Sequence, residues 1–228
     1  MKLLHNTLGV LCAFALMTIL LITSVEAVCY WTPGYFEKEY AKYDVLEDVQ
    51  MEMDDLLDVT DEMMAYLRGD REDLHIMTTV AGQAREFFNA REIAHMEDVR
   101  GLFIGALSLR LIALAVIAVS LILLFVLKAD IRYLLPRTLL AGSVLFFALL
   151  ALLAGIISTD FTKYFVIFHE LFFNNDLWML DPNTDLLINI VPEPFFSDTA
   201  ARIGLTYGIS VIVVFALCLL AIRASRRR

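Results

Sequence analysis

Long apolar stretches alternate with polar segments along this chain. Four stretches stand out, at residues 8–25, 102–127, 139–157 and 203–222. Each approaches or exceeds the roughly 20 residues that a helix needs to cross ~30 Å of hydrocarbon. Because a soluble core seldom contains four such stretches, the pattern predicts a mainly α-helical, multi-pass membrane protein with four transmembrane helices.

Basic residues flank these stretches and predict how the chain crosses the membrane. They are Lys2 before the first stretch, Lys128, Arg132 and Arg137 after the second, and Arg223, Arg226, Arg227 and Arg228 after the fourth. Under the positive-inside rule these flanks, and both termini with them, are cytoplasmic. The expected order is transmembrane helices in 1–27, 102–127, 139–157 and 203–222, extracytoplasmic cap segments in 28–101 and 158–202, and cytoplasmic segments in 128–138 and 223–228.

Composition agrees with a membrane protein and describes its outer part. Apolar residues make up 59% of the chain, and the mean hydropathy is +0.69. Residues 28–101 hold 18 acidic and 7 basic side chains, and residues 158–202 hold 7 acidic and 2 basic ones. We attribute this excess of acid to the solubility of an exposed cap rather than to recruitment of a cationic partner. A nucleic-acid partner is not expected.

The cysteines and the N-terminus leave one alternative open. Cys29 alone lies outside the apolar stretches, whereas Cys12 and Cys218 lie inside them, so neither an internal disulfide nor a thiolate metal site is expected. The tripeptide Val25-Glu26-Ala27 resembles a signal peptidase site after an apolar stretch. Cleavage there would leave three spans. We expect retention of the first helix, because its apolar stretch is longer than a usual signal core.

The cap is expected to be mostly helical, with one β-hairpin. Apolar residues at helical spacing between 52 and 67, followed by Gly69, predict an amphipathic helix. Residues 74–80 are expected to be extended. Residues 177–180 and 186–191, on either side of a turn rich in Asp, Pro and Asn, are expected to pair as a β-hairpin.

Two polar caps predict the helices that carry the candidate site. Asn89 with Glu92 three residues later is a capping box, so a helix should begin there and continue without a breaker into the second span. Asp160 can cap a second helix that runs to Phe173 with a stripe of aromatic residues. Such a helix is expected to lie in the membrane interface.

Two histidines on these helices, His95 and His169, are the candidates for chemistry. His95 should lie roughly 10 to 12 Å outside the apolar stretch, with Arg91 and Asp98 one turn away and Asp98 placed to orient a ring nitrogen. His169 lies among phenylalanines, where a low dielectric would keep it neutral and basic. A helical histidine among charges is more often only a surface residue, and we interpret His75 in that way.

The predicted substrate-binding residues are Arg91, Asp98, several aromatic residues and one arginine within a span. The aromatic candidates are Phe172, Phe173, Trp178, Phe195 and Phe196. They either anchor the protein at the interface or line an acyl-binding pocket. Arg110 lies roughly 12 Å inside the second span, where a charge costs at least ~2.5 kcal/mol on insertion scales. It either shapes the floor of a pocket or snorkels to the outer interface.

The two histidine segments together resemble a known family. They read Arg91-Glu92-x-x-His95-Met96-x-Asp98-Val99 and His169-Glu170-x-x-Phe173, followed by Trp178, Asp181-Pro182-Asn183-Thr184-Asp185 and Pro192-x-x-Phe195-Phe196. The pairing resembles the lipoprotein intramolecular transacylases (Lit) of Gram-positive bacteria, over almost the full length. The resemblance implies an enzyme of the bacterial cell membrane with four transmembrane helices and an extracytoplasmic cap, in which His95 and His169 are catalytic.

The reaction implied by this resemblance moves the sn-2 acyl chain of a diacylglyceryl-cysteine lipoprotein to the α-amino group of the same cysteine. The expected partners are that lipoprotein and membrane lipids, and no cofactor or metal is needed. We expect one histidine, His169, to act as base and the other, His95, as acid. Two alternatives remain: a metal-dependent membrane hydrolase that uses the histidines with Asp98 or Asp181, and a non-catalytic envelope sensor or accessory protein.

Overall fold

The computed structural model describes residues 1–226, so Arg227 and Arg228 of the predicted cytoplasmic tail lie outside the described residues. The chain divides into two compact units. The first contains Met1–Ala27, Leu107–Thr159 and the chain from Arg202 onward, and the second contains Val28–Ala106 and Asp160–Ala201.

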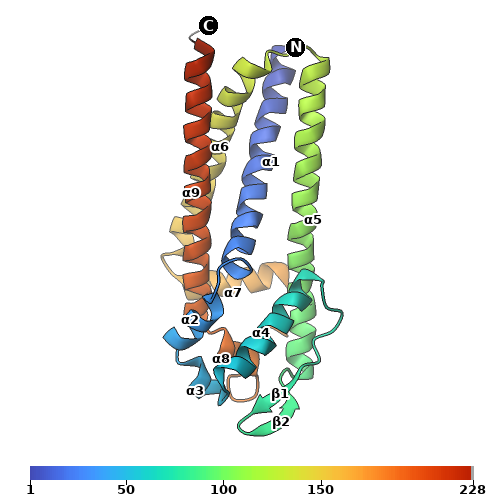
Figure 1. Ribbon diagram of the computed structural model, residues 1–228, viewed down its shortest axis with the longest axis vertical. Helices are drawn as coiled ribbons and strands as arrows, with labels where there is room; N and C mark the ends of the chain where they lie inside the picture. The colour runs from blue at the N-terminus through green and yellow to red at the C-terminus, as the bar shows by residue number, and fades with distance from the viewer. Residues whose placement is uncertain (227–228) are drawn as a thin grey trace. The chain divides into compact units, whose positions relative to one another are not determined.

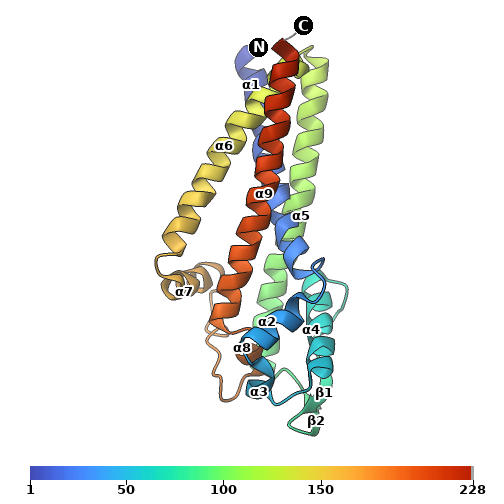
Figure 2. The ribbon, with the colours of Figure 1, turned by 60° about the vertical axis from the view of Figure 1, so that its left-hand side comes forward.

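The first unit is built from long apolar helices. The helices are α1 (Lys2–Cys29), α5 (Ala90–Val126), α6 (Ile131–Ile157) and α9 (Glu193–Arg226), of which α5 and α9 begin within the second unit (Figure 1). All four are long and apolar enough to cross a membrane. The prediction of four spanning helices is therefore confirmed, and Figure 2 shows the same helices from another side.

Helix α1 packs closely into this bundle. A side chain at Gly9 would lie 2.2 Å from Thr138 Oγ1, and one at Gly142 would lie 2.5 Å from Ala13 Cβ. The two glycines therefore allow α1 and α6 to approach through their backbones, as small residues do in membrane helix pairs. Of the residues in the most apolar part of α1, 39% are buried, compared with 11% to 17% in the other three helices.

The second unit contains most of the two segments that were predicted to form a cap, and it is mostly helical. Its remaining helices are α2 (Tyr35–Lys42), α3 (Val45–Val49), α4 (Met53–Arg68), α7 (Phe161–Phe172) and α8 (Leu186–Ile190). Helix α4 buries Leu56, Val59, Met63 and Leu67 on one face, as their spacing predicts, and ends at Gly69 with a φ of 88°. Helix α3 packs against α2 and α8, and α4 contacts α2.

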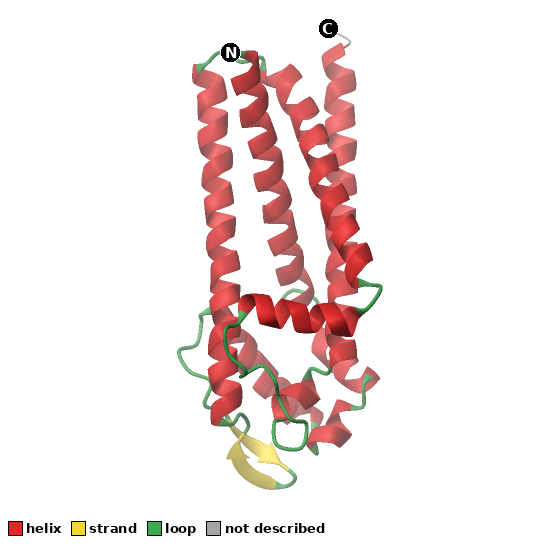
Figure 3. Ribbon diagram, turned by 180° about the vertical axis from the view of Figure 1, so that it is seen from behind, coloured by secondary structure: helices red, strands yellow, loops and turns green. Residues whose placement is uncertain are grey.

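The β-hairpin exists, but its predicted position was wrong. Strand β1 (Met77–Val80) pairs antiparallel with β2 (Gln83–Glu86) through a turn in which Ala81 and Gly82 both have positive φ (Figure 3). The extended conformation expected for 74–80 is present in β1.

Residues 177–191, where the hairpin was expected, form turns and α8 instead. The Asp181 carbonyl accepts a hydrogen bond from the Asp185 N–H at 2.8 Å, and the Asp185 side chain accepts one from the Asp181 N–H at 2.7 Å. This closed turn leads directly into α8. Leu187 and Ile190 are both buried, and their spacing of three residues suits one helical face rather than a strand.

Candidate active site

The beginning of α5 fixes the position of His95. Asn89 Oδ1 accepts hydrogen bonds from the N–H groups of Arg91 at 2.9 Å and Glu92 at 3.1 Å. Glu92 Oε2 accepts one from the Asn89 N–H at 2.7 Å. The predicted capping box is therefore confirmed. It places His95 on the second turn of α5, three residues after Glu92.

Helix α7 fixes both the position and the tautomer of His169. The Asp160 side chain caps the helix by accepting from the Lys163 N–H at 3.1 Å. His169 Nδ1 lies 2.7 Å from the Phe165 carbonyl oxygen. Because a carbonyl only accepts, Nδ1 must carry the proton. In the neutral ring Nε2 then carries a lone pair and can accept a proton.

The structure brings the two histidines together from segments 74 residues apart in sequence. Their ring centroids are 6.2 Å apart, and the residues His95 and His169 are 7% and 8% exposed. Phe173 meets His95 edge-on at 5.3 Å. On the other ring, Trp178 stacks against His169 at 4.9 Å and Phe165 contacts it at 4.4 Å. The pair therefore lies inside a largely aromatic enclosure.

This enclosure lowers the pKa of both histidines. For His95, burial is the main cause, proximity to His169 and Arg91 adds to it, Asp98 opposes it, and the pKa falls to about 4. For His169, burial lowers the pKa, and the hydrogen bond to the Phe165 carbonyl partly opposes the effect. Both rings are therefore neutral at pH 7, and each is able to accept a proton.

The aromatic residues predicted from sequence take three different positions. Phe173 and Trp178 contact the histidine rings directly. Phe172 is 51% exposed and packs on Phe168 at 4.7 Å. Phe196 reaches the site indirectly, since its ring lies 5.3 Å from that of Phe165. Phe195 is instead buried against the aromatic residues of α2: Tyr35, Phe36 and Tyr40.

Asp98 does not orient a ring nitrogen of His95 as predicted, and Arg91 on the same face binds elsewhere. Asp98 Oδ2 accepts a hydrogen bond from Asn175 Nδ2 at 2.8 Å. Arg91 donates to the Asp176 carbonyl. Both therefore bind the loop that follows α7, because that loop packs over the face of α5 on which they lie. His95 Nδ1 is buried, and within residues 1–226 it neither donates nor accepts a hydrogen bond.

Arg110 lies in the first unit, where it contacts a carboxylate. Its Nη1 forms an ion pair with Glu26 Oε2, in which Glu26 is buried and Arg110 partly buried. Glu26 was considered in the sequence only as part of the signal-peptidase-like tripeptide. A role for Arg110 in substrate binding stays a prediction.

Sequence reasoning missed the polar contacts that tie the two histidine segments together. Glu92 Oε1 accepts a hydrogen bond from the Leu187 N–H at 2.6 Å, and Asn89 Nδ2 donates to Asp185 Oδ1 at 2.7 Å. Burial raises the pKa of Glu92 despite these bonds. Burial also acts to raise the pKa of Asp185, but hydrogen bonds from Asp181, Asn89 and Thr184 lower it overall. The capping box was the only local signal for this network.

Metal ligands do not gather in the part of the chain that the structure describes. Within residues 1–226, no group of three or more His, Cys, Asp or Glu side chains is arranged to hold a metal ion.

Comparison with known proteins identifies relatives of this chain. A sequence profile described as lipoprotein intramolecular transacylase Lit matches residues 10–196. No curated protein matches the chain significantly. The fold is similar to the solved structure of the membrane-integral lipoprotein intramolecular transacylase Lit from Bacillus cereus, with a TM-score of 0.80, 20% identity and 100% of both chains covered.

Two variants of that Bacillus cereus protein are also similar. One has a histidine replaced by arginine and the other a histidine replaced by alanine. Each matches with a TM-score of 0.76 and 20% identity over 98% of this chain, and 94% and 96% of those chains are covered. At this identity the likeness establishes the fold, which is that of a multi-pass, membrane-integral protein.

Proposed function

Because the chain belongs to the family of lipoprotein intramolecular transacylases (Lit), we propose that it moves the sn-2 acyl chain of a diacylglyceryl-cysteine lipoprotein to the α-amino group of the same cysteine. The product is an N-acyl, monoacylglyceryl lipoprotein. The observation that carries the proposal is the buried pair of His95 and His169, with centroids 6.2 Å apart and with Nε2 of His169 left as a proton acceptor.

The two histidines are proposed to move one proton in opposite steps. His169 Nε2 accepts a proton from the α-amine as its nitrogen attacks the ester carbonyl carbon. The carbon–oxygen bond to glycerol then breaks, and the departing glyceryl oxygen receives a proton from neutral His95, which takes up in its place the proton held by His169. Because the pKa of His95 falls to about 4, the ring is neutral at rest and passes on a proton that it receives from His169 rather than keeping it. The net change is one proton and one acyl group transferred, with no water consumed.

The aromatic enclosure supports an intramolecular reaction. Donor ester and acceptor amine belong to one molecule, so the enzyme has to hold them in contact rather than collect them from solution. Phe173 and Trp178 cover the two rings, and their apolar surfaces suit an acyl chain. The amine needs only a modest base, because its ordinary pKa is near ~8.

The proposed orientation places this chemistry outside the cell. Basic residues flank the ends of the spans that are expected to face the cytoplasm, and the acidic cap carries both histidines. The substrate is then met at the outer membrane interface, where a diacylglyceryl lipoprotein is anchored.

Mass spectrometry of lipoproteins from cells with and without the protein tests this function. The proposed reaction only rearranges atoms, so the intact mass should not change. Fragment ions should instead show the acyl group on the cysteine nitrogen, and the amine should stop reacting with amine reagents. Loss of one acyl mass would indicate a hydrolase. Identical spectra with a free amine in both strains would favour the sensor or accessory alternative.

A further inference from the structure

Both histidine rings are almost fully buried, although a substrate has to reach them. Two cap cavities, of about 360 and 510 Å³, are lined by neither histidine. The segment that covers His169 is residues 174–185, which connects α7 to α8 and which we name the strap. Its Trp178 lies flat on His169, with an interplanar angle of 30°. Access to His169 therefore depends on where the strap is held.

One end of the strap is held by exposed contacts. Asn175 Nδ2 donates to Asp98 Oδ2 at 2.8 Å, and Asn175 Oδ1 accepts from the Leu177 N–H at 3.1 Å. The Asn175 carbonyl also accepts from Trp178 Nε1 at 3.0 Å. Asn175 thus links α5 to both the backbone and the indole of the strap, and Arg91 of α5 binds the neighbouring Asp176. All these bonds are open to water and easily exchanged.

The other end of the strap is held by buried contacts. Asn89 binds the Asp185 side chain at 2.7 Å, and Glu92 binds the Leu187 N–H at 2.6 Å. Asp185 and Leu187 are both buried. Glu92 and Asp98 lie three residues before and after His95, so the two ends are fixed on either side of it. The exposed end is the one that can release while the buried end stays in place.

We propose that Asp98 and Asn175 are positioning residues that hold the strap closed, with Trp178 over His169, and that release of this contact uncovers His169 for the substrate. The strap turns about its buried end at Glu92 and Asp185. The use of the uncovered ring in transacylation rests on the proposed function, whereas the covering of the ring does not.

Chemical modification of histidine in the purified full-length protein measures this covering. Diethyl pyrocarbonate reacts with unprotonated imidazole, and peptide mass spectrometry reports the rate at each histidine. We expect His169 to react more slowly than His75 in the wild-type protein. Asp98→Ala and Asn175→Ala should each speed modification of His169 roughly five- to tenfold, the effect of losing one exposed hydrogen bond. The rate at His75 should not change.

A conservative variant separates the hydrogen bond from the charge of Asp98. Asp98→Asn keeps an oxygen that accepts from Asn175 but removes the charge, so His169 should be modified at the wild-type rate. Wild-type modification of His169 in both Asp98→Ala and Asn175→Ala would overturn the proposal. A parallel rise in alkylation of the buried Cys218 would indicate general loosening and would also count against it.

A second readout follows the open strap during turnover. With the strap released, water can attack the ester carbonyl, which breaks the glyceryl bond and yields a free fatty acid. Asn175→Ala should therefore release free fatty acid at the expense of N-acyl product. If wild-type protein shows no acyl transfer at all, the proposed function fails, but the modification rates still decide whether the strap covers His169.

Discussion

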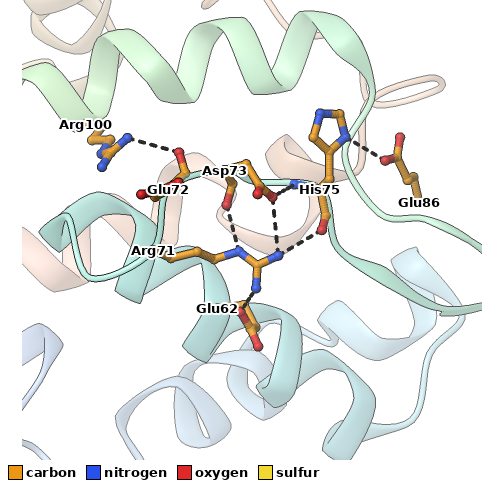
Figure 4. A network of polar contacts seen from close by, with 7 residues as sticks. All are labelled: Glu62, Arg71, Glu72, Asp73, His75, Glu86 and Arg100. Carbon is orange, nitrogen blue, oxygen red and sulfur yellow. Dashed lines mark hydrogen bonds and ion pairs between the residues drawn. The ribbon is translucent and has the colours of Figure 1, made fainter.

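The second unit contains histidines in two contrasting environments. His75 is 62% exposed, and its Nδ1 lies 2.6 Å from Glu86 Oε1 (Figure 4). Around it, Arg71 binds Glu62 and the carbonyls of Asp73 and His75. The pair of His95 and His169 has aromatic rings and one backbone carbonyl as neighbours instead.

The difference shows what separates a structural histidine from a candidate for catalysis. The exposed ring makes a contact with a carboxylate in which both side chains are open to water, so the contact contributes little to stability. Aromatic rings that exclude water disfavour the charged form. A proton taken up there is therefore readily given away, which is the property that acid/base chemistry needs.

Removal of either buried histidine should have the largest effect. His95→Ala or His169→Ala is expected to lower the rate of acyl transfer by roughly 10² to 10⁴, the usual contribution of general acid/base catalysis. The readout is blocking of the cysteine α-amine in a reconstituted substrate. His75→Ala serves as the matched control and should leave the rate within about twofold. Full activity in either buried variant would rule out the proposed mechanism.

Acidification should have the next largest effect, on the stability of the folded protein. Folding lowers the pKa of His95 from 6.5 to about 4, so between these values the folded state binds fewer protons than the unfolded state. Above pH 6.5 this difference does not affect the free energy of unfolding. As the pH falls from 6.5 towards 4, the free energy of unfolding decreases, by at most about 1.4 kcal/mol per pH unit.

Thermal unfolding in detergent between pH 7 and pH 5 measures this loss. The wild-type protein should lose stability more steeply than His95→Asn, which cannot titrate. Parallel curves for wild type and His95→Asn would show that burial does not depress the pKa of His95.

Replacement of Glu92 should have an intermediate effect. The Glu92 carboxylate accepts from the N–H groups of both Asn89 and Leu187. In Glu92→Gln one of these donors meets an amide NH₂, which leaves a buried donor unsatisfied at a cost of about 1 to 3 kcal/mol. The midpoint of thermal unfolding should fall accordingly. Glu62→Gln, in the exposed network, is the control, and an equal loss there would remove the contrast.

The smallest effect is expected at the partner of His75. Glu86→Gln removes an ion pair whose two side chains are both well exposed. The free energy of unfolding should therefore change by less than about 1 kcal/mol. Acyl transfer should be unchanged. A tenfold loss of activity would mean that the network of Figure 4 has a role that its exposure does not suggest.

Local signals in the sequence account for what was predicted correctly. A stretch of some 20 apolar residues and a capping box at Asn89 each act within a few turns, so four long helices and the start of α5 could be inferred. The expected hairpin at 177–191 was wrong because alternation over so few residues does not distinguish a strand from one turn of helix. Only the closed turn at Asp181 and Asp185 decides between them.

The contacts around the histidines depend on residues distant in sequence. Asp98 and Asn175 are 77 residues apart, and Glu92 and Leu187 are 95 apart. An asparagine in a polar loop carries no signal for such a partner. The proximity of His95 and His169 was expected from the family resemblance, whereas the strap and its two ends could be recognised only in the folded chain.

The contact between Arg110 and Glu26 bears on how the protein is made. Glu26 is synthesised 84 residues before Arg110, so we expect α1 to enter the membrane before α5. Alone, an arginine within a span raises the cost of insertion by at least about 2.5 kcal/mol. The Glu26 carboxylate of the neighbouring helix α1 offsets part of that cost by pairing with the arginine. We therefore expect α1 to act as a template for the insertion of α5, so that the order of synthesis helps to assemble the bundle.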